Sequence, residues 1–434
     1  MNLDSLCDEL RSAASSLSLR TAEEKNRALL AVAEALDAHR AEILSANGRD
    51  VAKARAGGMR DSLLARLSLS DAGLNEIIDS LHVLIEQTDP IGEVISGWKV
   101  PNGLEIRQVR VPLGVIAVIY ESRPNVTVDV FALAYKSSNA VLLRGSSSAL
   151  ESNRALLKAI KAGLTASGGE NRAVALSEPA TEGDNTHADV DWILNAVGKI
   201  DVVLPRGGAA LIQRVVANAK VPVIETGAGT CHVYVDESAD ADMAVDIIEN
   251  AKIQKPGACN ALECLLVHSS RAAEVLPKVL ASFGKYEAKT GRSGGVEMRC
   301  DERALSLLSS GGARPANVIP AVESDWGMEF LDYIFAVRVV DSLNEAIAYV
   351  NAHNTKHSEV IITENRANAR AFQSRVDAAC VYVNASIRFT DGGQFGMGAE
   401  VGISTQKLHA RGPMGVTALT TIKYLIEGEG QVRP

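Results

Sequence analysis

The feature that most constrains this chain is a regular alternation of continuous apolar runs with helical segments. A first series of apolar runs lies at 115–120, 140–145, 173–178, 201–208 and 221–227. A second series lies at 231–237, 261–268, 336–342, 359–364 and 380–385. Strands that are apolar along their whole length and are joined by helices form parallel sheets that helices cover on both faces. We therefore predict an α/β fold with two successive sheet domains.

Helical patterns occupy the first ninety residues. Thr21 opens a capping-box pattern, and the helix after it carries Ala28, Leu29, Val32 and Leu36 at a spacing of three to four residues. Ser70 is placed to cap a further helix with a strongly apolar face. We therefore expect helices to precede the first sheet.

A β-hairpin is predicted between these helices and the first sheet. Two extended runs, 94–100 and 104–111, are joined by Pro101-Asn102-Gly103, a strong turn signal. The second run alternates apolar and polar residues, so one of its faces is polar and we expect it to lie outside the main sheets. The tail is glycine-rich from 392 to 415 and then predicts a short strand near 422–426.

The bulk composition excludes several classes of protein. A chain of 434 residues exceeds a single small core, and two or three domains are expected. The net charge of −9 and the lack of a long Lys/Arg run argue against a nucleic-acid partner. We see no secretory signal, transit peptide or membrane-spanning apolar run. The six sparse cysteines include no CxxC pair, which favours a reducing, cytoplasmic location over a disulfide framework or a structural zinc site.

Cys259 is the strongest candidate for a reactive group. Pro256 and Gly257 end the preceding helix, so Cys259 falls on a sharp connection with small neighbours. A thiol there can be exposed, and nearby backbone N–H groups favour its thiolate form. A cysteine that merely follows a turn is the alternative. We interpret the other cysteines as structural or incidental: Cys7, Cys231, Cys264, Cys300 and Cys380.

Three strand ends carry further polar groups. Glu225 ends a buried run and is followed by glycines, which places a carboxylate at the edge of a sheet where ligands bind. The turns Arg144-Gly145-Ser146 and Arg206-Gly207-Gly208 each join a strand to a helix and could hold a phosphate. The chain has no GxGxxG fingerprint, and each turn could equally be only a turn. A loop glutamate facing solvent is the alternative for Glu225.

Longer motifs resemble a known family. The 34-residue spacing from Glu225 to Cys259 resembles the glutamate and cysteine pair of the aldehyde dehydrogenase superfamily. Four blocks resemble, within that superfamily, the γ-glutamyl phosphate reductase family over essentially the whole chain. They are Tyr120-Glu121-Ser122-Arg123-Pro124-Asn125, Leu204-Pro205-Arg206-Gly207-Gly208, Cys259-Asn260-Ala261-Leu262-Glu263 and the tail from 383 to 413.

The resemblance implies an aldehyde-dehydrogenase-like fold. It consists of a Rossmann-type cofactor domain, an α/β catalytic domain and a small β element for oligomerisation. The cofactor domain would comprise 1–93 and 112–229, and the catalytic domain, with Cys259, 230–386. The oligomerisation element would comprise 94–111 and 410–434, and 387–409 would be a linking loop. A homo-oligomer is therefore expected.

The resemblance also assigns roles to particular residues. It implies NADPH as the cofactor, with contacts from Arg144, Gly145, Ser146, Arg206, Gly207, Gly208, Gly227 and Glu329. Asn125 matches the amide that helps to form the oxyanion hole. Four residues of the family-specific tail could bind the two anionic ends of the substrate, although each could instead be a surface charge or an inter-subunit ion pair. They are Arg388, Lys407, His409 and Arg411.

The implied activity is that of an oxidoreductase, a phosphorylating glutamate-5-semialdehyde dehydrogenase. It would reduce L-γ-glutamyl 5-phosphate to L-glutamate 5-semialdehyde and phosphate through a Cys259 thioester, the second step of proline biosynthesis. A glutamate kinase is a possible partner. Glu225 could assist deprotonation of the cysteine or gate the site. The alternatives are a hydrolytic NAD(P)-dependent aldehyde dehydrogenase and a catalytically inactive scaffold with the same fold.

Some positions depart from the family pattern or suggest other chemistry. Thr230 stands where the family usually has Asn, Lys-Pro-Gly-Ala precedes the cysteine, and 168–190 is atypical. His353 and His357 are four residues apart, but they lie in a helix-to-strand connection and no third ligand is evident. We therefore expect hydrogen-bonded histidines and no metal.

Overall fold

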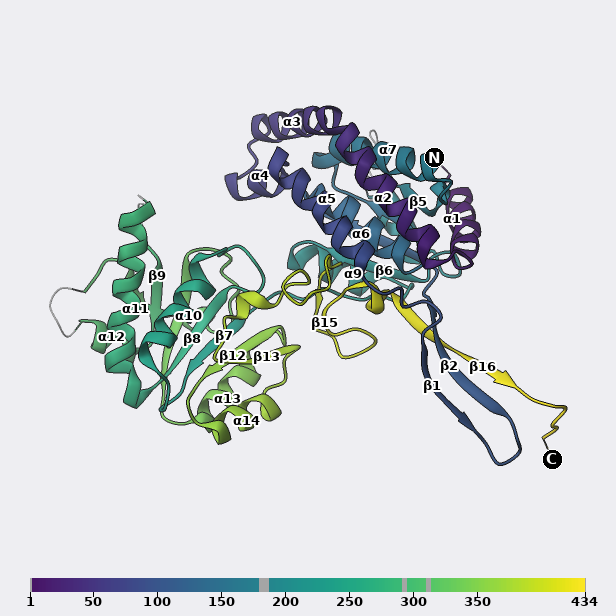
Figure 1. Cartoon of the computed structure of the whole chain (residues 1–434). Helices are drawn as coiled ribbons and strands as arrows, with labels where there is room; N and C mark the ends of the chain where they lie inside the picture. Colours follow the sequence, from purple (N-terminus) through teal and green to yellow (C-terminus); the bar gives the residue numbers. More distant parts are fainter. Residues whose placement is uncertain (1, 179–186, 291–294, 310–313, 434) are drawn as a thin grey trace. The chain divides into compact units, whose positions relative to one another are not determined.

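The computed structural model describes residues 2–178, 187–290, 295–309 and 314–433, and the chain forms two compact units (Figure 1). The first unit comprises Met1–Thr226, Gly392–Gly402 and Leu408–Pro434. The second unit comprises Gly227–Asp391 and Ile403–Lys407. The chain thus passes from the first unit into the second twice, the second time only for Ile403–Lys407, and returns to the first unit each time.

The first unit contains a parallel four-stranded sheet in the order β5-β4-β3-β6. Its strands are β3 (Val115–Tyr120), β4 (Ala140–Arg144), β5 (Val174–Leu176) and β6 (Val202–Arg206). All residues of β3 and β4 are buried, as expected for strands that are apolar on both faces. The predicted parallel sheet is therefore confirmed, with the first strand of the series in its interior.

Helices surround this sheet, and they begin where the sequence predicts. Thr21 forms a complete capping box with Glu24 at the start of α2, and the Ser70 side chain caps α5. The helices of the first unit are α1 (Leu3–Leu17), α2 (Ala22–Ala38), α3 (Arg40–Ala56), α4 (Asp61–Leu67), α5 (Asp71–Glu86), α6 (Asn125–Lys136), α7 (Leu150–Ser167), α8 (Ala188–Asn195) and α9 (Ala209–Asn218).

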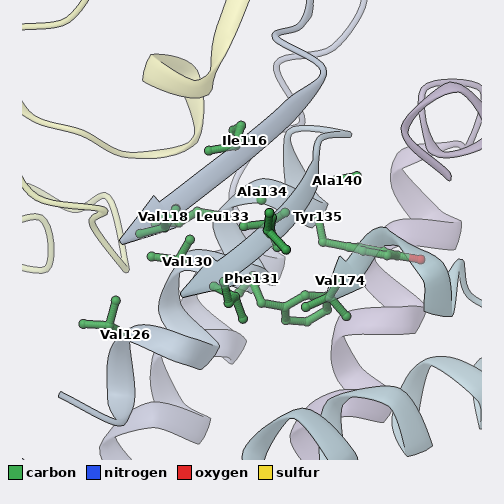
Figure 2. Close-up of a cluster of buried hydrophobic side chains, with 14 of the residues drawn as sticks. Ile116, Val118, Val126, Val130, Phe131, Leu133, Ala134, Tyr135, Ala140 and Val174 are labelled. Carbon is green, nitrogen blue, oxygen red and sulfur yellow. The ribbon is translucent and has the colours of Figure 1, made fainter. Parts of the chain in front are cut away.

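Helix α6 is anchored firmly against the sheet. Figure 2 shows side chains of α6, among them Val130 and Phe131, beside Ile116 and Val118 of β3. All four side chains are buried in one hydrophobic cluster that continues into α2, α5 and α7. A fully packed helix of this kind holds the groups on its first turn in a fixed position.

The predicted hairpin forms a separate antiparallel sheet. β1 (Val94–Lys99) pairs with β2 (Glu105–Pro112), and β2 pairs with β16 (Thr420–Glu427) near the end of the chain. Gly103, in the turn, has a φ of +91°, which a glycine adopts without strain. The three strands project from the rest of the first unit, as Figure 1 shows. The expectation that the hairpin lies outside the main sheets is therefore confirmed.

The second unit contains a parallel seven-stranded sheet in the order β10-β9-β11-β8-β7-β12-β13. Its strands are β7 (Cys231–Val235), β8 (Leu262–His268), β9 (Glu297–Cys300), β10 (Val318–Pro320), β11 (Ile334–Val340), β12 (Ser358–Ile362) and β13 (Cys380–Val383). The five strands predicted for this region are all present. β9 and β10 are additional strands that the sequence did not predict, because each is only three or four residues long.

Two separate hydrophobic clusters cover the faces of this sheet. One cluster joins it to α10, α11 and α12, and the other joins it to α13 and α14. These helices are α10 (Ala241–Ile253), α11 (Ser269–Thr290), α12 (Glu302–Ser309), α13 (Leu343–His353) and α14 (Arg366–Arg375). Within the described part of the chain, no helix is long and apolar enough to cross a membrane.

The prediction of a strand at 221–227 is wrong. Only Val223 makes an isolated bridge, to Val203 of β6, and the rest of the segment is irregular. Hydrogen bonds flank that bridge on both sides, but the ladder stops there. The apolar residues of this segment are explained by its burial beside the sheet. Part of the atypical stretch 168–190, namely 179–186, lies outside the described residues.

We predict opposite effects of the same substitution at two helical glycines of the first unit. A Cβ at Gly163 of α7 would lie 2.6 Å from the Val32 Cα of α2, whereas one at Gly48 of α3 would meet nothing within 4 Å. Gly163→Ala should lower the free energy of unfolding by about 1–3 kcal/mol through overpacking. Gly48→Ala should raise it by about 0.5–1 kcal/mol through helix propensity.

Urea unfolding followed by circular dichroism measures both variants against the parent chain. Equal effects of the two substitutions would contradict the close approach of α7 to α2.

Candidate active site

Cys259 lies in the turns that join α10 to β8. α10 ends at Ile253, and the following residues make consecutive turns up to the first residue of β8, so the Pro-Gly signal acts as predicted. The Ala258 N–H donates to the Lys255 carbonyl, and the Ala261 N–H donates to the Ala258 carbonyl. Cys259 is partly exposed, whereas the other five cysteines are buried. The thiol that the sequence singles out is therefore the accessible one.

Contacts to the Cys259 carbonyl and to the neighbouring Asn260 side chain hold the loop that carries the thiol. The Cys231 thiol donates to the Cys259 carbonyl oxygen at 3.3 Å. A Cβ at Gly229 would lie 1.5 Å from the same oxygen, so only glycine fits there. The Asn260 side-chain amide donates to the Thr390 carbonyl at 2.8 Å and to the Arg388 carbonyl at 3.2 Å. These contacts fix the loop that carries the thiol.

Arg388 is a cation whose charge is attracted to Cys259. Its Nε donates to the Gln254 side-chain oxygen at 2.8 Å, which holds the guanidinium beside the nucleophile loop. Burial lowers the pKa of Arg388, and its attraction to Cys259 is the largest influence that opposes this shift. A guanidinium near a thiol favours the thiolate form.

The remaining thiols are placed in surroundings that suppress ionisation. Burial raises the pKa of Cys7 to about 11 and the pKa values of Cys264 and Cys300 to about 12. Burial also raises the pKa of Cys231 well above its ordinary value. At neutral pH these four groups are neutral thiols and poor nucleophiles.

Glu329 contacts the backbone that packs on Cys259. Its Oε1 accepts from the Gly229 N–H at 2.6 Å. Close by, Thr230 donates its hydroxyl to the Gly327 carbonyl and its N–H to the Thr355 hydroxyl, so both donors of this residue, which departs from the family pattern, are bonded. A Cβ at Gly227 would lie 2.3 Å from the Thr405 hydroxyl oxygen, so Gly227 marks another close approach of two segments.

A buried ion pair connects these segments, and the sequence analysis missed it. Lys252 of α10 and Glu263 of β8 are both fully buried, with Nζ and Oε2 3.1 Å apart. The other oxygen of Glu263 accepts from the Leu331 N–H, two residues after Glu329. Burial raises the pKa of Glu263 to about 7 and lowers that of Lys252. The sequence did carry a signal for this pair, because Glu263 interrupts an apolar strand and Lys252 lies on the buried face of a helix.

Asn125 is the first residue of α6 in the first unit. Its side-chain Nδ2 donates to Oδ2 of Asp129, one turn further along the helix, at 2.9 Å. Asn125 is exposed and Asp129 is partly exposed. The amide is therefore accessible and held by a single carboxylate. The sequence did not identify Asp129.

Arg206 offers an unused donor at the end of β6. Within the part of the chain that the structure describes, its Nε is buried and has no hydrogen-bond partner. The next residues, Gly207 and Gly208, lead into α9, and the Gly208 N–H donates to the Glu121 carboxylate at 3.0 Å. A buried unpaired guanidinium nitrogen beside a helix N-terminus suits an anionic ligand such as a cofactor phosphate.

Arg144 is already paired with a carboxylate. Its Nε donates to Asp189 at 2.8 Å, and its Nη1 donates to the Gly145 carbonyl. Both charged side chains are nearly buried. Ser146 bonds Ser148 at the following helical turn. The role of this turn in cofactor binding stays a prediction.

Glu225 follows the isolated bridge at Val223 and is partly exposed. It belongs to the first unit, together with Asn125, whereas Cys259 belongs to the second. Thr226 donates its hydroxyl to the Pro205 carbonyl at 2.9 Å, which ties this segment to β6. The catalytic roles of Asn125 and Glu225 stay predictions.

The four tail residues divide between the units. Arg388 and Lys407 belong to the second unit, and His409 and Arg411 to the first. Lys407 pairs with Asp377 at 2.9 Å. His409 is exposed and donates from Nε2 to the Ala418 carbonyl. The charge of Arg388 is attracted to Cys259, which lies in the same unit.

His353 and His357 have separate partners. His353 bonds the Tyr349 carbonyl and stacks on the Tyr349 ring, whereas buried His357 bonds the Ser358 hydroxyl. In the described ranges, no group of three or more His, Cys, Asp or Glu side chains could hold a metal ion.

The comparisons with known proteins identify the family of the chain. The model of the aldehyde dehydrogenase family matches residues 1–299. The γ-glutamyl phosphate reductase of Treponema pallidum is 59% identical, over 98% of both chains. That of Thermobifida fusca is 50% identical, over 99% of this chain and 98% of its own. The crystal structure of the γ-glutamyl phosphate reductase of Thermotoga maritima has a TM-score of 0.91 and 46% identity, and each chain is covered completely.

A more distant structure shows how far the fold extends. An acetylating aldehyde dehydrogenase from Geobacillus thermoglucosidasius has a TM-score of 0.68 at 17% identity, which shows a shared fold alone. Together with the nearer relatives, these matches show that the chain belongs to the aldehyde dehydrogenase family, in the group of the γ-glutamyl phosphate reductases. It is an oxidoreductase of the predicted fold class, and membership of this family implies a nicotinamide cofactor.

We predict that iodoacetamide at neutral pH modifies Cys259 selectively. The other thiols are buried, and burial raises the pKa of four of them. Peptide mapping by mass spectrometry of the native protein should show labelling at Cys259 first. Earlier labelling of Cys264 would contradict the assignment of the accessible thiol.

Proposed function

We propose that this chain reduces L-γ-glutamyl 5-phosphate to L-glutamate 5-semialdehyde and phosphate with NADPH, the second step of proline biosynthesis. One observation carries the proposal. A chain that is 59% identical to a γ-glutamyl phosphate reductase keeps a single partly exposed thiol, Cys259, on a fixed loop. A cytoplasmic location and association with a glutamate kinase stay predictions.

The Cys259 thiolate is the nucleophile of the proposed reaction. Its sulfur attacks the acyl carbon of the substrate, a tetrahedral oxyanion forms, and collapse of this species breaks the bond to phosphate and leaves a thioester. The acyl phosphate matters because a free carboxylate is a poor electrophile and phosphate is a good leaving group. Arg388 supports this step, because its guanidinium interacts with Cys259.

Asn125 supplies one donor to the oxyanion in this mechanism. Its side-chain amide is exposed at the start of α6, and a backbone N–H of the Cys259 loop would be the second donor. Removing one donor of an oxyanion hole typically costs about 10²–10³ in rate. Glu225 is proposed to assist deprotonation of the thiol or to gate the site.

The residues present fit a nicotinamide dinucleotide. Arg206, Gly207 and Gly208 would hold a phosphate, because the buried Arg206 Nε has no partner among the described residues. Arg144, Gly145, Ser146, Gly227 and Glu329 are the further proposed contacts. When bound, the reduced nicotinamide supplies a hydride to the thioester carbonyl. Collapse of the resulting tetrahedral adduct on Cys259 would then break its C–S bond, release the semialdehyde and return the Cys259 sulfur as a thiolate.

The substrate carries an α-carboxylate and a phosphate, and the basic tail residues are proposed to bind them. Arg388 has the strongest support because of its position beside Cys259. Lys407 has a carboxylate partner in Asp377, so it would have to exchange that partner for substrate. His409 and Arg411 are exposed and stay candidates.

We predict that Cys259→Ser abolishes reduction and leaves NADPH binding near normal. The hydroxyl is a far weaker nucleophile than the thiolate, while the cofactor contacts remain. The assay couples glutamate, ATP, a glutamate kinase and NADPH, and follows cofactor oxidation. NADPH affinity is measured by fluorescence titration.

Cys264→Ala is the matched control, because Cys264 is a buried thiol on the adjoining strand. It should retain turnover at some cost in stability. More than a few per cent of activity in Cys259→Ser would overturn the covalent mechanism. Running the reverse reaction with the aldehyde and NADP⁺ should require phosphate, and turnover without phosphate would favour a hydrolytic dehydrogenase.

We also propose that the sheet β1-β2-β16 mediates homo-oligomerisation. It carries a group of large apolar side chains that are exposed in the single chain, namely Val94, Ile95, Trp98, Ile422, Tyr424 and Ile426. Isolated exposed apolar residues are ordinary, but a cluster on one small sheet marks an interaction surface.

We predict that Trp98→Glu combined with Ile426→Glu reduces the molar mass of the protein in solution. A carboxylate at each position would have to be desolvated in the interface. Size-exclusion chromatography with light scattering measures the mass. Leu19→Glu, at an exposed apolar residue outside this sheet, is the control and should leave the mass unchanged. An unchanged mass in the double variant would contradict the assignment.

A further inference from the structure

We propose that Asp129 is a positioning residue for Asn125, and that its carboxylate turns the Asn125 amide so that an N–H faces the oxyanion. This inference rests on the proposed function, because it assumes that Asn125 stabilises the oxyanion. It adds a residue that neither the motifs nor the comparisons assign.

The geometry of the first turn of α6 carries the argument. Asn125 and Asp129 are four residues apart on one helix, and their side chains meet with Nδ2 and Oδ2 2.9 Å apart. Among the described residues, Asp129 is thus the hydrogen-bond partner that orients the Asn125 side chain. Asn125 is otherwise exposed at the helix start, where a side chain without a partner would rotate freely.

The chemistry of the two groups explains why a carboxylate is needed. A primary amide has a donor face and an acceptor face, and presenting the oxygen to an oxyanion would repel it. An ionised carboxylate can only accept, so its partner must be the NH₂ group of Asn125. One N–H is then used by Asp129 and the second is left for the developing negative charge.

The rest of α6 keeps this pair in place. Val126, Val130 and Phe131 lie between and beside the two residues on the same helix, and all three are buried in the core of the first unit (Figure 2). The helix therefore cannot move to compensate for a lost side-chain contact. Amide orientation then depends on Asp129 itself.

The charge state of Asp129 makes the role testable by pH. Although part of the residue stays exposed, desolvation of its carboxylate raises its pKa to about 6. The Asn125 amide and the positive charge of Arg206 on β6 oppose this rise, and Arg206 is the charged group that acts on Asp129 from a neighbouring element. Above this pKa the group is ionised and accepts from Asn125. Below this pKa, the protonated carboxyl group can donate to the amide oxygen, so the Asn125 side-chain amide can adopt the flipped orientation.

The test is Asp129→Asn, which keeps the size of the side chain and removes the charge. We expect kcat in the coupled reductase assay to fall by about 10-fold or more, because a misplaced catalytic group can cost about 10²-fold. KM and the affinity for NADPH should stay within about two-fold of the parent values, because the substitution leaves the contacts that bind substrate and cofactor in the ground state unchanged. The loss of kcat that the parent shows as pH falls through about 6 should be absent from the variant. Asp191→Asn, which removes the carboxylate of an exposed residue of α8, is the control and should change none of these values.

A double-mutant cycle separates positioning from mere helix stabilisation. Asn125→Ala alone should lose about 10²–10³ in kcat. If Asp129 acts through Asn125, Asp129→Asn should cost nothing further in the Asn125→Ala background. A purely structural role would lower the melting temperature and give additive losses with an unchanged pH profile, which would overturn the proposal. If Asp129→Asn proves poorly folded, Asp129→Ser is tested in the same cycle. Absence of turnover in the parent chain would instead overturn the proposed function.

Discussion

The carbonyl group of Cys259 is the point on which the catalytic loop depends. Cys231 donates to its oxygen, and Gly229 passes so close that no side chain could be accommodated. Glu329 in turn accepts from the Gly229 N–H. Gly229 therefore links Glu329, a proposed cofactor contact, to the residue that carries the nucleophile. A shift of this peptide would move both at once. The precision of the site is thus a property of backbone packing as much as of the reactive sulfur.

Buried pairs of hydrogen-bonded ionisable side chains reinforce that packing. His232 of β7 and Glu359 of β12 are both fully buried, 3.0 Å apart, and occupy paired positions of the sheet. Lys252 and Glu263 join α10 to β8 in the same manner. Such pairs contribute little net stability compared with apolar residues of equal volume, but removing one partner leaves a costly unpaired charge. One pair joins β7 to β12, and the other joins the helix before Cys259 to the strand after it.

Much of this architecture could be predicted from local patterns. The continuous apolar runs located most of the buried strands along the chain, Thr21 predicted a helix start, and Pro256-Gly257 predicted the partly exposed turn before the thiol. Partnerships between distant residues could not be predicted, because no local pattern records them. Arg144 looked like a free phosphate ligand, but it pairs with Asp189. The run at 221–227 looked like a strand, but burial beside a sheet needs no ladder.

The three-stranded sheet has a consequence for how the protein is made. Its hairpin, β1 and β2, leaves the ribosome long before its third strand, β16, which begins at Thr420. Throughout translation the edge of β2 that β16 will cover therefore stays open, with unpaired backbone groups and apolar side chains exposed to neighbouring nascent chains. The edge closes only after β16 has been made and has paired with β2. A chain that stops shortly before residue 420 would keep this edge of β2 unpaired and prone to association with other chains.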